Sequence, residues 1–341
     1  MSTARHITRK ALPKFMAITT APTTTSPRIP QRSGKPGAHR HQSKRWLPYV
    51  LIAPAVVFEL LIHFTPMVTG IWISFLQLTS ASIANWSTAP FAGIGNYQIA
   101  VSTTNQQGAA LLNSFAITSG FTLIVVAVSW GLGMAAAVAL QRAFRSRAIF
   151  RTIFLIPYAV PMYAGIIAWK FIFQQQTGVL NQILVALHLA NPATPPFWLI
   201  GSNAFASVVV VAIWRTWPFA FLMLMAGLQT INEDLYEASA LDGAKPFRQW
   251  RAITLPELGG VNRVLVLVLF LWTFNDYNDP AILFGEGQPP SGDLISFHIY
   301  NNSFSTLNFG FGASMSTLLL LFLLVVSAAY LLFVNRRSTR A

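Results

Sequence analysis

Cysteine is absent from the chain and charged residues are scarce. None of the 341 residues is cysteine, which excludes disulfide bonds, thiol nucleophiles and metal sites with cysteine ligands. Only 10% of the residues are charged, whereas an ordinary soluble domain has roughly 25%. Hydrophobic residues make up 54% of the chain. This composition excludes an ordinary globular protein of the cytosol and favours a protein embedded in a membrane.

Acidic residues are missing from the first 45 residues, which hold ten of the 23 basic residues. The segment is rich in Thr, Pro, Ser and Arg and has no sustained apolar run, so we expect residues 1–45 to form a disordered basic cytoplasmic tail. An acid-poor leader is also typical of a transit peptide, the weaker alternative. The other 13 basic and 10 acidic residues nearly balance. The net charge of +13 therefore does not indicate a nucleic acid partner.

Six apolar stretches follow the tail, and each is long enough to cross the hydrocarbon core of a lipid bilayer as a helix of about 20 residues. They are residues 49–76, 111–140, 149–173, 204–228, 261–284 and 311–334. The alternating pattern of a membrane barrel is absent, so helices are the predicted form of every span. The sequence thus predicts an all-α integral membrane protein with six transmembrane helices in residues 46–341.

Lys and Arg are lacking from three alternate connections, residues 77–110, 174–203 and 285–310. Because basic residues gather on the cytoplasmic side of a membrane, these connections are predicted to face outward and both termini to lie in the cytoplasm. Of the 23 basic residues, 21 fall on the predicted cytoplasmic side. The exceptions are Lys170, expected to extend to the outer interface, and Arg215, near the middle of the fourth span.

The cytoplasmic connection at residues 229–260 has the features of two short helices. Asn232 is a suitable cap, and Glu233 and Asp234 follow it in the first turn. Gly243 is expected to break the first helix, and Pro246 and Pro256 to begin and end the second. Such a helical hairpin suits a groove on a partner protein, although it also suits an amphipathic pair lying on lipid headgroups.

Residues 237–256, EASALDGAKPFRQWRAITLP, resemble the EAA loop of permease subunits in binding-protein-dependent ABC importers. Ser239 replaces the usual second Ala of that motif. The resemblance implies a coupling helix that docks into a separate ATPase subunit, which would use ATP and Mg, and a translocation fold without a cofactor of its own. The coupling residues it implies are Glu237, Ala238, Ser239, Asp242, Gly243, Phe247 and Pro256.

Other segments are similar to the carbohydrate-uptake branch of that family, the maltose and glycerol-phosphate type. Residues 53–75 resemble its first span, residues 91–101 its GxxNY segment, and residues 273–304 the fifth span and outer loop of the subunit that holds the sugar in maltose-type systems. The usual Gly-Gly-Pro of that loop is Gly-Glu-Gly-Gln-Pro here, at residues 285–289. The resemblance implies a bacterial cell-membrane protein with four kinds of partner: a second homologous permease, two ATPase subunits, an extracytoplasmic solute-binding protein and a carbohydrate substrate.

Catalytic motifs are lacking as well. The sequence has no G-x-x-x-x-G-K-[ST], no H-E-x-x-H and no G-x-S-x-G, so we expect a transport subunit and not an enzyme. The alternative substrates are glycerol-phosphate diesters or another polar solute. The alternative of another class is a secondary carrier or channel outside the ABC family.

Polar and aromatic residues inside the fourth and fifth spans are candidates for the substrate pathway, because polar groups in a membrane usually serve a function. A sugar needs aromatic surfaces beside hydrogen-bonding groups. The candidates are Arg215, Thr216, Phe219, Trp272, Thr273, Asp276 and Tyr277, with Tyr163 of the third span as a weaker one. The alternative is that Arg215 forms a structural ion pair with Asp276 or Glu59. An unpaired Arg215 would favour an anionic substrate, and a paired one a neutral sugar.

Overall fold

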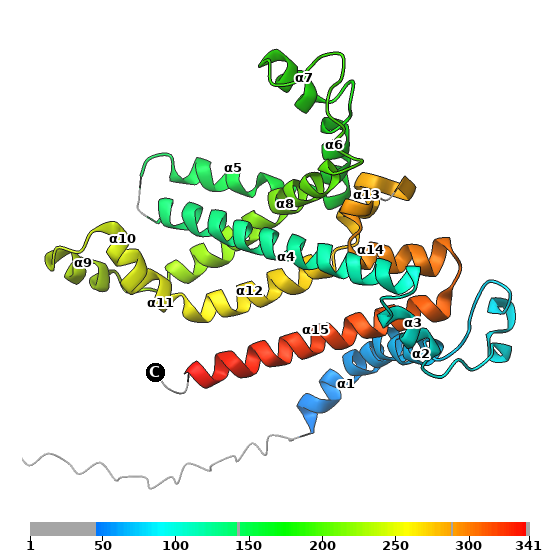
Figure 1. Ribbon diagram of the computed structural model, residues 1–341. Helices are drawn as coiled ribbons and strands as arrows, with labels where there is room; N and C mark the ends of the chain where they lie inside the picture. The colour runs from blue at the N-terminus through cyan, green and yellow to red at the C-terminus, as the bar shows by residue number, and fades with distance from the viewer. Residues whose placement is uncertain (1–45, 142–143, 288, 339–341) are drawn as a thin grey trace, which may run out of the picture. The chain divides into compact units, whose positions relative to one another are not determined.

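A computed structural model describes residues 46–141, 144–287 and 289–338 (Figure 1). Within these residues every regular element is a helix, and β structure is limited to two isolated antiparallel bridges, Leu76 with Phe91 and Thr79 with Asn308. The predicted all-α class is therefore confirmed. The predicted tail, residues 1–45, lies outside the described residues. The chain divides into two compact units, Met1–Val56 and Val57–Ala341, and the described part of the first unit is mainly the beginning of α1.

Four helical segments of the described chain are long and apolar enough to cross a membrane. The first, Leu47–Ile73, consists of α1 (Leu47–Glu59), the π-helical turn η1 (Leu60–Phe64) and α2 (Thr65–Ile73). The others are α4 (Gln106–Ala139), α8 (Asn203–Leu228) and α15 (Phe309–Ser338). These four segments overlap the predicted first, second, fourth and sixth spans.

The predicted third span is bent, and a second bend lies just before the predicted fifth span. Helices α5 (Arg147–Ala159) and α6 (Met162–Ile172) meet at 89°. Pro161 lies at this break, and Val160 before it has an extended backbone with ψ at 133°, the conformation that a following proline favours. The fifth span contains α12 (Gly259–Phe274) and α13 (Asn278–Phe284). Residues Gly259–Phe284 make an angle of 73° with the preceding segment, Pro246–Glu257. The count of six spans is reached when each bent pair counts once.

Helices α4 and α8 pack closely along one another and form the centre of the core. Phe121 and Val125 of α4 and Phe221 and Leu224 of α8 are fully buried. Gly133 permits the close approach, because a Cβ atom at this position would lie 2.7 Å from the backbone nitrogen of Phe221. Small residues commonly allow such contacts between helices in membranes.

Short elements make up the connections. Those in the predicted outer connections are η2 (Ile83–Thr88), α3 (Gly95–Val101), α7 (Val179–Ala186), η4 (Gly285–Gly287), η5 (Pro290–Gly292), α14 (Ile295–Tyr300) and η6 (Asn301–Ser305). Those in the predicted cytoplasmic loop are α9 (Glu233–Leu241), α10 (Pro246–Gln249), η3 (Trp250–Thr254) and α11 (Leu255–Glu257). Figure 1 shows α9, α10 and α11 beyond one end of α12, with α13 and α14 at the other end.

Candidate functional site

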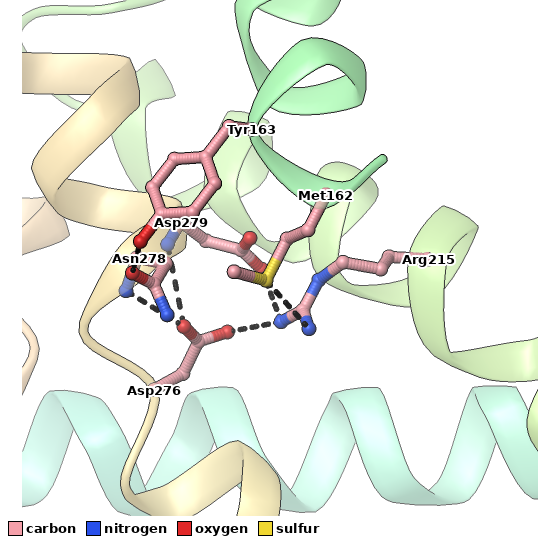
Figure 2. A network of polar contacts seen from close by, with 6 residues as sticks. All are labelled: Met162, Tyr163, Arg215, Asp276, Asn278 and Asp279. Atoms are coloured by element: carbon pink, nitrogen blue, oxygen red, sulfur yellow. Dashed lines mark hydrogen bonds and ion pairs between the residues drawn. The ribbon is translucent and has the colours of Figure 1, made fainter. Parts of the chain in front are cut away.

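A cluster of charged side chains lies where the fifth span is interrupted (Figure 2). Arg215 of α8 donates from Nη2 to Oδ2 of Asp276 at 2.6 Å and to Oδ2 of Asp279 at 3.1 Å. The side chains of Asp276 and Asp279 are 3% and 0% exposed. The predicted pairing of Arg215 with Asp276 is thus present, whereas the alternative partner Glu59 contacts His63 at 3.2 Å instead. The cluster holds one guanidinium and two carboxyl groups.

Asp276 also explains the break between α12 and α13. Its Oδ1 accepts hydrogen bonds from the backbone N–H groups of Asn278 and Asp279, at 3.1 and 3.2 Å. These are the first N–H groups of α13, which have no partner inside that helix, so the carboxylate acts as a cap. One side chain therefore begins α13 and holds Arg215.

The bent third span is attached to the same region. Tyr163 of α6 donates its hydroxyl to Oδ1 of Asn278 at 3.3 Å, and Met162 places its sulfur 3.7 Å from Nη1 of Arg215. Lys170 donates from Nζ to the carbonyl oxygen of Ile282 at 2.9 Å. Lys170 therefore contacts α13, a partner that the sequence did not indicate.

The structure brings the predicted pathway residues together. Five of the eight line one cavity of 260 Å³, namely Arg215, Thr216, Trp272, Thr273 and Asp276. Phe219 packs against the ring of Trp272 with centroids 4.8 Å apart. Tyr277 contacts Tyr300 and Phe297 of α14, at 4.9 and 5.9 Å between ring centroids.

The exposure of these residues differs. Trp272 and Tyr163 are 55% and 58% exposed, whereas Thr216 and Thr273 are only 9% and 4% exposed. The aromatic rings are accessible surfaces, and the two threonines belong to the wall behind them. Sequence reasoning missed Asp279, Asn278 and the role of Lys170. The spacing of Asp276 and Asp279 by three residues, which places both on one side of a helical turn, was the available signal for Asp279.

The cytoplasmic loop is a helical hairpin with one side packed and the other free. Asn232 caps α9 as predicted, since its Oδ1 accepts from the backbone N–H of Asp234 at 3.1 Å. Gly243 has φ of +75° at the turn, a backbone conformation that favours glycine. The second helix does not end at Pro256, because helical turns continue to Glu257 in α11. Pro256 occupies the first turn of α11, where its missing N–H is not needed.

Hydrogen bonds and apolar contacts hold the packed side of the hairpin. Tyr236 and Thr254 join their hydroxyl groups at 2.9 Å, and Gln249 donates to Oγ of Ser239 at 2.9 Å. Tyr236 and Trp250 also pack against the core formed by α4, α8 and α12. Of the predicted coupling residues, Ser239 therefore contributes to the hairpin itself.

The free side carries most of the other predicted coupling residues. Glu237, Ala238, Asp242, Gly243, Phe247 and Pro256 are exposed. Phe247 and the neighbouring Leu241 are 71% and 90% exposed. Large apolar side chains with this exposure, beside carboxylates, are typical of a surface that another protein covers.

Comparison with known proteins identifies the family. Residues 127–339 match the family described as "Binding-protein-dependent transport system inner membrane component". The inner membrane ABC transporter permease protein YcjO of Escherichia coli (strain K12) is 32% identical over 280 residues, 81% of this chain and 90% of that protein. The trehalose/maltose transport system permease protein MalF of Thermococcus litoralis is 30% identical over 292 residues, 84% of this chain and 92% of that one.

A further relative is the sn-glycerol-3-phosphate transport system permease protein UgpA of Agrobacterium fabrum, 30% identical over 293 residues, 85% of this chain and 95% of that protein. Among solved structures, a chain of a bacterial ABC transporter that imports the acidic polysaccharide alginate has the same fold. Its TM-score is 0.69 at 19% identity, and the match covers 87% of this chain and 96% of that chain.

Proposed function

Because the chain belongs to the inner membrane components of binding-protein-dependent transport systems, we propose that it forms half of the pathway for a neutral sugar or oligosaccharide in an ABC importer. The relatives named for trehalose/maltose and for glycerol phosphate make both kinds of solute candidates. The observation that favours the neutral sugar is the pairing of Arg215 with two carboxyl groups.

The charge of the central cluster argues against an anionic solute. A phosphate ester would need a free cation, and the side chain of Arg215 is already engaged by Asp276 and Asp279. Because one guanidinium faces two carboxyl groups, the cluster has no net positive charge to attract an anion. A neutral sugar needs hydroxyl partners and an apolar surface for its C–H groups, and Trp272 with Phe219 offers such a surface beside Asn275 and Asn278.

Coupling to an ATPase is proposed for the exposed side of the hairpin at residues 229–260. Leu241 and Phe247 would enter a groove of the ATPase subunit, with Glu237 and Asp242 at its edge. The packed side, with Tyr236 and Trp250, would pass the movement to α4, α8 and α12. ATP binding by the partner would favour the outward-open state of the bundle, and hydrolysis would return it to the inward-open state. The direction of solute transport would then come from the different contacts that the partners make with these two states.

A second permease subunit is proposed to cover the first span. In the part of this span that belongs to the second unit, Phe58, Leu61 and Ile62 are 63%, 62% and 60% exposed. Glu59 and His63 lie inside it with side chains 70% and 71% exposed. A polar pair facing lipid at this depth is unfavourable, so a neighbouring protein helix is the better environment.

The remaining features of the proposal follow from the charge distribution and the family. The termini are proposed to be cytoplasmic, and an extracytoplasmic binding protein would deliver the solute to the outer connections, which lack Lys and Arg. The chain would use no cofactor of its own, catalyse no reaction and bind no nucleic acid. ATP and Mg would be used by the two ATPase subunits.

Uptake of radiolabelled solutes in a strain that lacks the chromosomal copy tests the proposal. Cells with the wild-type chain should accumulate trehalose or maltose and not sn-glycerol 3-phosphate. Trp272→Ala or Tyr277→Ala should lower sugar uptake roughly tenfold if each ring contributes about 1–2 kcal/mol of contact. Trp86→Ala, an exposed aromatic in a predicted outer connection, is the matched control. Uptake of the phosphate ester alone would overturn the neutral-sugar assignment.

A further inference from the structure

Two cavities lie beneath the hairpin, between it and the ends of α4, α5 and α8. The first has a volume of 580 Å³ and the second of 380 Å³. Gln141, Arg147 and Glu233 line both of them. The second cavity is also lined by Arg151 and by Gln229 at the end of α8. Neither cavity belongs to the central cluster.

Helix α5 turns its two arginines toward the protein. Phe154 on the same helix packs against Phe221 of α8, with ring centroids 5.7 Å apart. Arg147, Arg151 and Phe154 follow one another at helical spacing, so they share the side of α5 that faces α8. Helix α5 lies against α8 (Figure 1). Arg147 and Arg151 are half-buried there, whereas Ala148, Ile149 and Thr152 are exposed.

The two guanidinium groups have no counter-ion among the described residues. The Nε atoms of Arg147 and Arg151 are buried without a hydrogen-bond partner, and none of the ion pairs of the described chain includes either residue. Two like charges one helical turn apart repel each other. Buried donors without partners usually indicate that water, an ion or a ligand completes the site.

Glu233 is the acidic residue that shares the second cavity with both arginines. It is exposed in the first turn of α9, where a carboxylate is stabilised by the helix dipole, and it makes no ion pair with them. The amide groups of Gln141 and Gln229 add neutral hydrogen-bonding partners. Between the arginines the cavity therefore favours an anion with several acceptor oxygens.

We infer that Arg147 and Arg151 form a binding site for a phosphoryl group. Each guanidinium can donate two parallel hydrogen bonds, and a tetrahedral phosphoryl group offers enough oxygens for both, which a single carboxylate does not. The phosphoryl group comes either from the headgroup of an anionic phospholipid or from a soluble phosphate. An occupant would touch α5, the end of α8 and the start of the hairpin, the segments through which the proposed coupling runs. The site does not depend on which solute is carried.

The test uses the full chain purified in a non-ionic detergent. Thermal unfolding is followed in potassium phosphate and in potassium chloride at equal ionic strength, and native mass spectrometry counts phosphatidylglycerol molecules retained after purification from mixed-lipid vesicles. The variants are Arg147→Gln, Arg151→Gln and both together. Arg145→Gln is the matched control, because Arg145 is exposed in the same segment and lines neither cavity.

A soluble phosphate site predicts that phosphate raises the unfolding midpoint of the wild type and of Arg145→Gln by roughly 2 °C or more. The double variant should lose this rise. A lipid site predicts instead that the wild type and the control retain phosphatidylglycerol and the double variant retains several-fold less. A wild-type chain with neither a phosphate-specific rise nor retained phosphatidylglycerol overturns the inference, even if the variants fail to fold. Equal behaviour of the control and the double variant overturns it too.

Discussion

The central cluster and the cytoplasmic hairpin differ in how far their charged groups form ion pairs within the described chain. Asp276 and Asp279 are buried, and both accept hydrogen bonds from Arg215, whose side chain is 28% exposed. The hairpin instead leaves Glu237, Asp242 and Phe247 exposed, and no ion pair of the described chain includes either carboxylate. The charged groups of the first region pair with one another, whereas the two hairpin carboxylates have no such partner among the described residues. Substitutions in the cluster should therefore affect folding first, and those on the free side of the hairpin should affect assembly and coupling first.

The largest effect is expected from Arg215→Met. The change removes the cation and leaves two buried carboxyl groups without it, which costs about 3–5 kcal/mol. We expect loss of the folded chain, measured as the unfolding midpoint and the monodisperse fraction in detergent. Asp276→Asn and Asp279→Asn combined with Arg215→Met should restore part of the stability. Arg145→Met, at an exposed position, is the control and should have little effect. If Arg215→Met were as stable as Arg145→Met, the cluster would not be structural.

The next effect is expected from Gly243→Val in the hairpin turn. A β-branched residue at φ of +75° is strained by about 1–3 kcal/mol, so the turn should reshape while the spans stay intact. Sugar uptake should fall roughly tenfold or more if the reshaped turn weakens docking to the ATPase by about 1.4 kcal/mol. Membrane insertion, measured by protease protection, should be unchanged. Gly260→Ala, at a glycine without positive φ and with open space around it, is the control. Normal uptake by Gly243→Val would remove the coupling assignment.

Phe247 and Trp250 permit a direct comparison of the free and packed sides, since their rings stack at 5.6 Å. Phe247→Ala should weaken retention of the ATPase during co-purification by about tenfold, as for an apolar anchor at an interface. Its unfolding midpoint should stay near that of the wild type. Trp250→Ala should lower the midpoint because Trp250 packs against the core. The reverse pattern would mean that the two sides are assigned wrongly.

The smallest effect is expected from Tyr163→Phe. The hydroxyl of Tyr163 donates one hydrogen bond of 3.3 Å to Asn278, and Tyr163 is 58% exposed. Its loss should cost about 0.5–1.5 kcal/mol, visible as a change of a few-fold in KM for uptake and little change in stability. Abolished uptake would place Tyr163 in direct and essential contact with the solute.

The extent of most spans could be predicted from hydrophobicity alone. Residues 204–228 were expected to form the fourth span and α8 covers Asn203–Leu228, because the apolar run and the helix have the same cause. The cap at Asn232 was predictable for a similar reason, since capping involves only neighbouring residues. The pairing of Arg215 with Asp276 followed from the rule that charges inside membranes are paired.

The bends and the second carboxylate were not predictable from the sequence pattern. Pro54, Pro157 and Pro218 lie inside continuous helices, whereas the chain turns by 89° at Pro161. Local sequence does not distinguish these cases, because the surrounding helices decide whether a freed carbonyl finds a partner. The roles of Asp279 and Lys170 depend on where α13 lies in space, which is a property of the packed bundle.

The central claim is that ATP drives a neutral sugar through a pathway whose one deep arginine is already paired. The most direct test reconstitutes the purified importer in vesicles, supplies its binding protein, and compares accumulation of radiolabelled trehalose or maltose with that of sn-glycerol 3-phosphate, with and without ATP. Accumulation of the sugar alone, and only with ATP, is the predicted result. Accumulation of the phosphate ester, or sugar entry that is equally fast without ATP, would contradict the account.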